Sequence, residues 1–193
     1  QLLDYESLVV TIFAGRPKLP IKTPWDRKCG FKNSDEAIDQ RREENNRVAE
    51  LIGFHLQDLH FLDRQYCKRN QKEAVCKAIL RIVERYPKAK FYAPIAFGGK
   101  IIHPDHKIVR EAIYDIIINC KTQRLFFYAD IPYLIGDSKL KWKPIRNKKK
   151  KWLTNRIYKS QFRNLMKMFP LLNRESLGRE CIVSMKDYEK LTK

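Results

Sequence analysis

Short apolar runs alternate with longer segments of helical periodicity along this chain, and the alternation restricts the fold more than any other feature. Runs typical of buried strands lie at residues 8–14, 59–62, 91–93 and 125–128. Strands separated by helices in this way pair most simply in parallel, with the helices as crossovers. The sequence therefore predicts an α/β domain with a mostly parallel sheet. Ligands of such sheets lie at the carboxyl ends of the strands, so the loops after these four runs should line one cleft.

The helical segments carry recognisable start and stop signals. Ser34 is the expected N-cap of the first helix, and Gly53 is its expected C-terminal glycine. Pro87 ends the second helix, in which apolar residues repeat at three- and four-residue spacing. The expected helices cover residues 35–52, 74–86, 105–117 and 153–168, and a last strand covers residues 180–184.

Cysteine usage points to a reducing compartment. The chain has 193 residues and five cysteines, and no two of these form a CxxC pair. An odd number without that spacing argues against a disulfide framework or a cysteine zinc knuckle. The sequence contains no run of about 18 apolar residues, so no membrane-spanning helix is predicted. A cytoplasmic location is therefore expected.

Positive charge is concentrated in one stretch. The net charge is +18, and residues 138–174 hold thirteen Lys or Arg and no Asp or Glu. This basic connector and the helix within it would attract nucleic acid, anionic lipid or phosphorylated sugars, or would form a solvated surface. Trp142 and Trp152 lie among the lysines and could stack on bases. No recognised nucleic-acid motif accompanies them, which makes a nucleic-acid partner the weaker interpretation.

The densest chemical feature is His103-Pro104-Asp105-His106, at the entry to a helix. If Asp105 caps that helix, His106 lies in its first turn and His103 just before it, so both imidazoles can face one cleft. Imidazole nitrogen and carboxylate oxygen are natural zinc ligands, and a carboxylate beside a histidine fixes its tautomer and raises its pKa. The alternative is an Asp cap flanked by surface histidines.

Several further sequence segments occur in a characteristic order around this motif. They are Val9–Gly15, a helix with Arg41, Glu44, Ala49, Ile52 and Gly53, the run Phe61–Asp63, the segment Pro94–His106, Val109 with Ala112, and Tyr158–Gln161. In order and spacing they resemble the PIG-L/LmbE family of zinc-dependent N-deacetylases over nearly the whole chain. The resemblance implies a single Rossmann-like, three-layer domain over residues 1–193.

The resemblance also implies a mechanism and a set of site residues. Zinc is held by an early H-P-D-D motif and by the second His of H-P-D-H, which is His106 here. The zinc polarises the acetamide carbonyl and acidifies a bound water. His103 would stabilise the oxyanion or protonate the leaving amine, and Asp105 would orient His103. Arg41 and Asp63 match substrate-contacting positions, although Arg41 could instead pair with Glu44 and Asp63 could cap a turn.

The function implied is a divalent-metal hydrolase, with zinc as the expected metal, that removes acetyl from an N-acetylated sugar or a related amide. Two alternatives from other classes remain. One is a basic module that binds nucleic acid or an anionic membrane surface. The other is a family member that binds a sugar or a sugar conjugate without catalysis.

No H-P-D-D motif occurs in these 193 residues. The resemblance places that motif after a strand preceding residues 8–14, so we expect this chain to begin downstream of it and the sheet to lack its first strand. A zinc site needs about three protein ligands. We therefore predict that residues 1–193 alone bind zinc weakly, as measured by calorimetric zinc titration. We also predict that they hydrolyse little substrate. Zinc-dependent acetyl release by this polypeptide would contradict the prediction.

Overall fold

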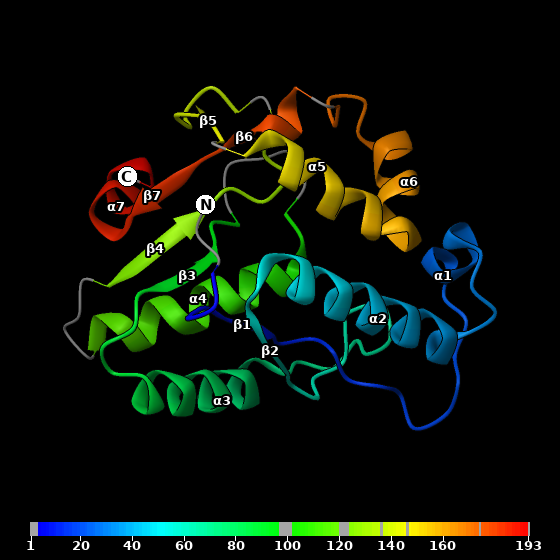
Figure 1. Ribbon diagram of the computed structural model, residues 1–193. Helices are drawn as coiled ribbons and strands as arrows, with labels where there is room; N and C mark the ends of the chain where they lie inside the picture. The colour runs from blue at the N-terminus through cyan, green and yellow to red at the C-terminus, as the bar shows by residue number, and fades with distance from the viewer. Residues whose placement is uncertain are drawn as a thin grey trace. The chain divides into compact units, whose positions relative to one another are not determined.

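The computed structural model describes residues 4–96, 102–119, 124–135, 137–145, 147–173 and 175–192, and Figure 1 traces them from end to end. The chain divides into two compact units. Unit 1 is Gln1–Lys68 with Ile145–Gly178, and unit 2 is Arg69–Pro144 with Arg179–Lys193. Each unit is thus assembled from segments distant in the sequence.

Both units combine helices with short strands (Figure 1). Unit 1 contains β1 (Leu8–Thr11), α1 (Pro24–Cys29), α2 (Ser34–Ile52), β2 (His55–Asp58), α5 (Lys148–Ile157), α6 (Lys159–Met168) and the 3-10 helix η1 (Ser176–Gly178). Unit 2 contains α3 (Lys72–Arg85), β3 (Phe91–Pro94), α4 (Pro104–Asn119), β4 (Leu125–Tyr128), β5 (Lys143–Pro144), β6 (Arg179–Glu180), β7 (Ile182–Ser184) and α7 (Met185–Leu191).

In unit 1, β1 and β2 form a parallel pair in which Leu8 lies opposite His55 and Thr11 opposite Asp58. The strand predicted at residues 59–62 is therefore four residues too late. The regular ladder stops where β1 stops. The apolar run beyond it makes an isolated bridge from His60 to Phe13 and two further backbone hydrogen bonds, from the Leu59 N–H to the Thr11 carbonyl and from the Gly15 N–H to the Phe61 carbonyl. Apolarity alone placed the strand wrongly, because pairing with β1 decides its position.

Helix α2 begins one residue earlier than predicted, because its cap is Asn33 and not Ser34. Asn33 is extended, and its side-chain oxygen accepts from the backbone N–H groups of Asp35 and Glu36. The Ser34 hydroxyl instead accepts from the N–H of Ile21, 3.1 Å away. The predicted stop is confirmed, since Gly53 has φ 89°, a left-handed conformation that favours glycine.

A short helix, α1, lies between residues 15 and 33, where the sequence predicted neither a helix nor a strand. Thr23 and Asp26 form a capping box around α1, and Pro24 occupies its first position. Asp26 is fully buried. These signals are local, and they place a buried carboxylate at the start of a six-residue helix.

The helix predicted at residues 153–168 is two helices, α5 and α6, separated at Tyr158. In an uninterrupted helix the N–H of Ser160 would donate to the carbonyl of Arg156. It donates instead to the buried carboxylate of Glu44 on α2, at 2.9 Å, and the Ser160 hydroxyl donates to the same carboxylate at 2.6 Å. A carboxylate at the start of α6 also suits the helix dipole. The first turn of α5 is the lysine run that was predicted as connector.

In unit 2, β3 and β4 are parallel, and β7 pairs with β4 in antiparallel fashion. The strand predicted at residues 180–184 is thus divided between β6, which pairs with β5, and β7. Helix α4 packs on β3 and α3 packs on α4 (Figure 1). Phe127 of β4 and Ile117 of α4 are fully buried and lie in the core between these layers. Residues 97–101, within the segment Pro94–His106, lie outside the described part of the chain.

Within the described residues, no helix is long and apolar enough to cross a membrane. The mixed helix-and-strand architecture agrees with the predicted α/β class. Parallel pairing is seen for β1 with β2 and for β3 with β4, while β5, β6 and β7 pair in antiparallel fashion.

Replacing Glu44 tests the link between α2 and α6. In Glu44→Ala the Ser160 N–H and hydroxyl lose a buried charged acceptor, and we expect the free energy of unfolding to fall by about 2–4 kcal/mol. The matched control is Glu43→Ala, which removes an exposed carboxylate paired with Arg47 and should cost at most about 0.5 kcal/mol. Urea denaturation of both variants gives the comparison. Equal losses would mean that the Glu44 contacts do not hold the two helices.

Candidate functional site

Two imidazoles lie side by side where α4 begins in unit 2. The ring centroids of His103 and His106 are 4.9 Å apart. The His103 carbonyl accepts the first helical hydrogen bond, from the N–H of Lys107. His103 is therefore the cap, Pro104 is the first helical residue, and Asp105 lies inside the first turn rather than capping it as predicted. His106 lies in that first turn, as predicted.

Asp105 faces back toward His103. Its carboxylate Oδ2 lies 4.0 Å from His103 Nδ1, and the Asp105 side chain is almost fully buried. A negative charge in the first turn is stabilised by the positive end of the helix. The orienting role that the resemblance implies for Asp105 requires the two side chains to be this close, and the role itself stays a prediction.

His106 has its own carboxylate, and the sequence analysis did not identify it. Asp130 Oδ2 lies 3.5 Å from His106 Nδ1, and the Asp130 side chain is only 3% exposed. The same oxygen accepts a hydrogen bond from the N–H of Ala96. Asp130 follows β4 and Ala96 follows β3, so the parallel pairing of these strands brings the two loops together. The rule that ligands gather at strand ends could have singled out Asp130.

An aromatic ring completes this cluster. Tyr133 lies 5.7 Å from the ring of His103 and 5.7 Å from the ring of His106. It comes from the same loop as Asp130. The loop after β4 therefore supplies both a buried charge and an aromatic contact to the two histidines.

The imidazole cluster does not by itself supply the donors of a zinc site. Zinc commonly takes three protein ligands and leaves one position open. Among the residues that the structure describes, no group of three His, Cys, Asp or Glu side chains is placed to hold a metal ion. These residues alone do not form a complete zinc site.

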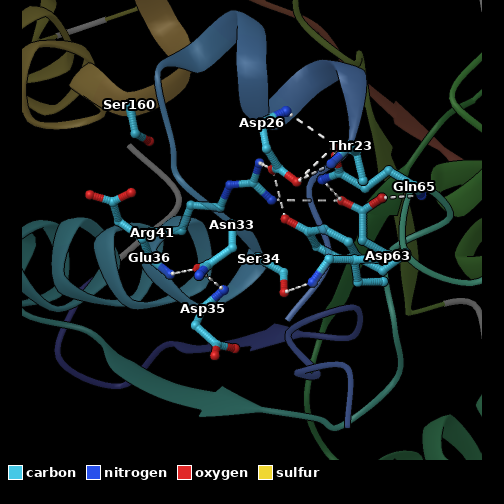
Figure 2. Close-up of polar contacts among 12 residues, drawn as sticks. Thr23, Asp26, Asn33, Ser34, Asp35, Glu36, Arg41, Asp63, Gln65 and Ser160 are labelled. Atoms are coloured by element: carbon cyan, nitrogen blue, oxygen red, sulfur yellow. Dashed lines mark hydrogen bonds and ion pairs between the residues drawn. The ribbon is translucent and has the colours of Figure 1, made fainter. Parts of the chain in front are cut away.

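In unit 1, Arg41 of α2 lies between two carboxylates, as Figure 2 shows. Its Nη2 is 4.0 Å from Asp26 Oδ1, and its Nη1 is 3.9 Å from Asp63 Oδ2. These are ion-pair distances rather than hydrogen bonds. The Nε and Nη2 atoms are buried and have no hydrogen-bond partner in the described structure. The alternative pairing of Arg41 with Glu44 does not occur, because Glu44 bonds Ser160.

Neutral donors saturate the Asp26 carboxylate. The Tyr66 hydroxyl donates to Asp26 Oδ1, and the N–H and hydroxyl of Thr23 donate to Oδ2. Burial raises the pKa of the Tyr66 phenol, and its hydrogen bond to Asp26 raises that pKa further. Tyr66 thus remains a proton donor. Asp63, in turn, accepts from the backbone and side chain of Gln65, so the turn-capping alternative also holds for it.

The predicted site residues therefore form two groups. His103, Asp105 and His106 meet in unit 2, and Arg41 and Asp63 meet in unit 1. Each group contains a buried carboxylate that the sequence analysis did not select: Asp130 in the first and Asp26 in the second. The capping box of α1 could have identified Asp26.

Comparisons with known proteins place these features in a family. The profile of the family described as "PIG-L: GlcNAc-PI de-N-acetylase" matches residues 3–117. No curated protein matches in sequence. The crystal structure of the A40926 pseudoaglycone deacetylase has a TM-score of 0.72 and 20% identity, covering 92% of this chain and 84% of that one.

Further solved structures share the fold. A deacetylase–teicoplanin complex has a TM-score of 0.69 at 18% identity and covers 92% of this chain and 87% of its own. A zinc-inhibited form of teicoplanin deacetylase has a TM-score of 0.67 at 18% identity and covers 93% and 88%. Structural similarity at this level of sequence identity establishes the α/β fold that the sequence predicted.

Alkaline titration tests the hydrogen bond around Asp26. The ordinary pKa of tyrosine is 10.0, and that of Tyr66 is raised. As pH rises above about 10, the unfolded chain loses this proton while the folded protein keeps it, so stability present at lower pH is lost. We expect Tyr66→Phe to lose less stability than wild type between neutral pH and about pH 11.

The comparison is made by urea denaturation at both pH values. Tyr5→Phe, at a side chain that is 74% exposed, is the control and should behave like wild type. Equal alkaline losses in wild type and Tyr66→Phe would refute the assignment of this proton.

Proposed function

This chain belongs to the PIG-L family of de-N-acetylases, and from that premise we propose that it is a hydrolase that removes the acetyl group from an N-acetylated sugar. The family match includes the five candidate catalytic, metal and substrate residues, from Arg41 to His106. A GlcNAc-type sugar is the proposed substrate. A sugar conjugate is also supported, since one solved structure of the same fold is a complex with teicoplanin.

The observation that carries this proposal is the pair of imidazoles, each beside a buried carboxylate. Amide hydrolysis requires stabilisation of a developing oxyanion and a proton for the leaving amine. His103 directs Nδ1 toward Asp105, which leaves Nε2 to hold the proton offered to substrate. Asp105 stabilises the protonated ring and fixes its orientation.

His106 has a different proposed role. Its Nδ1 faces Asp130, and a carboxylate at that position typically orients a histidine whose Nε2 binds a metal. We therefore propose His106 as a ligand of a divalent cation, with Asp130 as its orienting partner. The described residues do not complete a metal site.

Arg41 and Asp63 are proposed to contact the substrate. The support is the state of the guanidinium: Nε and Nη2 are buried without a hydrogen-bond partner, and both neighbouring carboxylates are beyond hydrogen-bond distance. Buried donors without acceptors are costly. A phosphate or hydroxyl oxygen bound here would satisfy them, while the carboxylate of Asp63 could accept from a sugar hydroxyl.

One observation favours a second candidate function. The buried Arg41 donors without a hydrogen-bond partner would bind a sugar hydroxyl or phosphate equally well in a family member that does not hydrolyse the sugar. Sugar binding without turnover distinguishes this candidate from the hydrolase.

The test is an assay of the full gene product on GlcNAc and on a water-soluble GlcNAc–inositol phosphate. We expect acetate and a new primary amine to appear in equal amounts. His103→Ala removes the proton donor and should lower the rate by roughly 10²–10⁴-fold.

The matched control is His55→Ala, which removes an exposed imidazole on β2 and should leave the rate unchanged. Binding of either sugar without release of acetate, in every divalent metal tried, would favour the non-catalytic candidate. A rate that survives His103→Ala would contradict the proposed role of that residue.

A further inference from the structure

Helices α5 and α6 present positive charge with no acidic residue among it. No Asp or Glu occurs between residues 138 and 174. The cations on the two helices are Lys148, Lys149, Lys150, Lys151, Arg156, Lys159, Arg163 and Lys167. All but Lys150 are exposed. Like charges so close together repel one another, so a surface of this kind is stabilised by an anionic partner.

Exposed apolar side chains stand among these cations at helical spacing. Leu153 is 41% exposed and lies on α5 four residues after Lys149 and three before Arg156. Residues three and four apart share one helix face, so this leucine has a cation on each side.

Helix α6 carries a similar pair at three-residue spacing. Met166 is 38% exposed and lies three residues after Arg163 and next to Lys167. Met168 and Leu171, at and beyond the end of the helix, are 46% and 59% exposed. The α5–α6 face, defined here as Lys149, Leu153, Arg156, Arg163, Met166 and Lys167, thus combines apolar tips with flanking cations on both helices.

Both helices are fixed to the interior of unit 1. Ile157 and Tyr158 pack against the core cluster of Val48, Ala49 and Phe54. Ser160 is held by the buried carboxylate of Glu44. The orientation of α5 and α6 is therefore set by core contacts, while the side chains of the α5–α6 face are exposed.

We propose that the α5–α6 face binds the surface of an anionic lipid bilayer. Helices that lie on membranes carry Lys and Arg beside exposed apolar residues, so that the cations meet lipid phosphates while the apolar tips enter the acyl boundary. Leu153 and Met166 are the inserting residues. This binding goes beyond the proposed hydrolase activity and does not depend on it.

The aromatic side chains favour lipid over nucleic acid. Binding of single-stranded nucleic acid uses exposed aromatic rings as stacking platforms. The Trp152 ring packs edge-on against Phe162, at 6.5 Å between centroids. The Trp142 indole N–H donates to the Asp137 carbonyl. Both tryptophans thus have contacts within the protein, and the exposed side chains between the cations are aliphatic, which suits acyl chains rather than bases.

Co-sedimentation of the full chain with phosphatidylcholine vesicles, with and without phosphatidylserine, tests the proposal. We expect binding only to the phosphatidylserine vesicles, and weaker binding as salt is raised. A triple variant, Lys149→Gln, Arg163→Gln and Lys167→Gln, should bind about a hundredfold more weakly, since each cation near an anionic surface contributes roughly fivefold. A double variant, Leu153→Ser and Met166→Ser, should lose at least about tenfold.

The matched control is Arg81→Gln, Lys88→Gln and Lys90→Gln, which removes the same charge from exposed positions in unit 2 and should bind like wild type. Circular dichroism melting establishes that each variant is folded. Equal losses of vesicle binding in the control and the triple variant would show that the effect depends only on net charge, and would overturn the proposal. Full binding by the double variant would also overturn it. So would binding of RNA by the wild type at a salt concentration that abolishes vesicle binding, if the triple variant no longer bound that RNA.

Discussion

Carboxylates removed from water hold distant segments of this chain together. A buried charge is tolerated only when hydrogen-bond donors surround it. Asp26 takes its donors from Thr23 and from Tyr66, 40 residues away in the sequence. Glu44 takes donors from Ser160, which is 116 residues away. Asp130 takes the N–H of Ala96 from the loop after a neighbouring strand. Each carboxylate therefore specifies a contact that apolar packing alone would leave free to shift.

The same constraint shapes the candidate site. Asp130 is held by Ala96 in a place from which it can orient His106, and Asp105 sits in the first turn of α4, where it can orient His103. Asp26 and Asp63 lie near Arg41, yet neither saturates its guanidinium. Buried groups left without a partner concentrate where a protein binds something else. The Arg41 guanidinium is among the buried groups left without a hydrogen-bond partner, and we propose that substrate binds it.

Charge is divided between the interior and the surface of unit 1. The acidic residues Asp26 and Glu44 are buried, while the cations of α5 and α6 face outward. The bond between Glu44 and Ser160 interrupts what would be one long basic helix and fixes its second half separately. A single buried carboxylate thereby determines how the basic surface is presented, which links the packing of the core to the surface that we infer to meet lipid.

Local signals were sufficient for much of the fold. The spans of α2, α3 and α4 and the strands β3 and β4 follow from apolar periodicity, from Gly53 and from Pro87, because these act over a few residues. The grouping of His103, Asp105 and His106 was also readable, since one helical turn brings them together.

Only the tertiary structure decided the position of β2, the break at Tyr158 and the pairing of His106 with Asp130. Each depends on a partner distant in the sequence: the ladder of β1, the carboxylate of Glu44 and the parallel alignment of β3 with β4. Sequence periodicity records which side of an element is buried, but it does not record which residue lies opposite, and that choice follows from the packing of the whole unit.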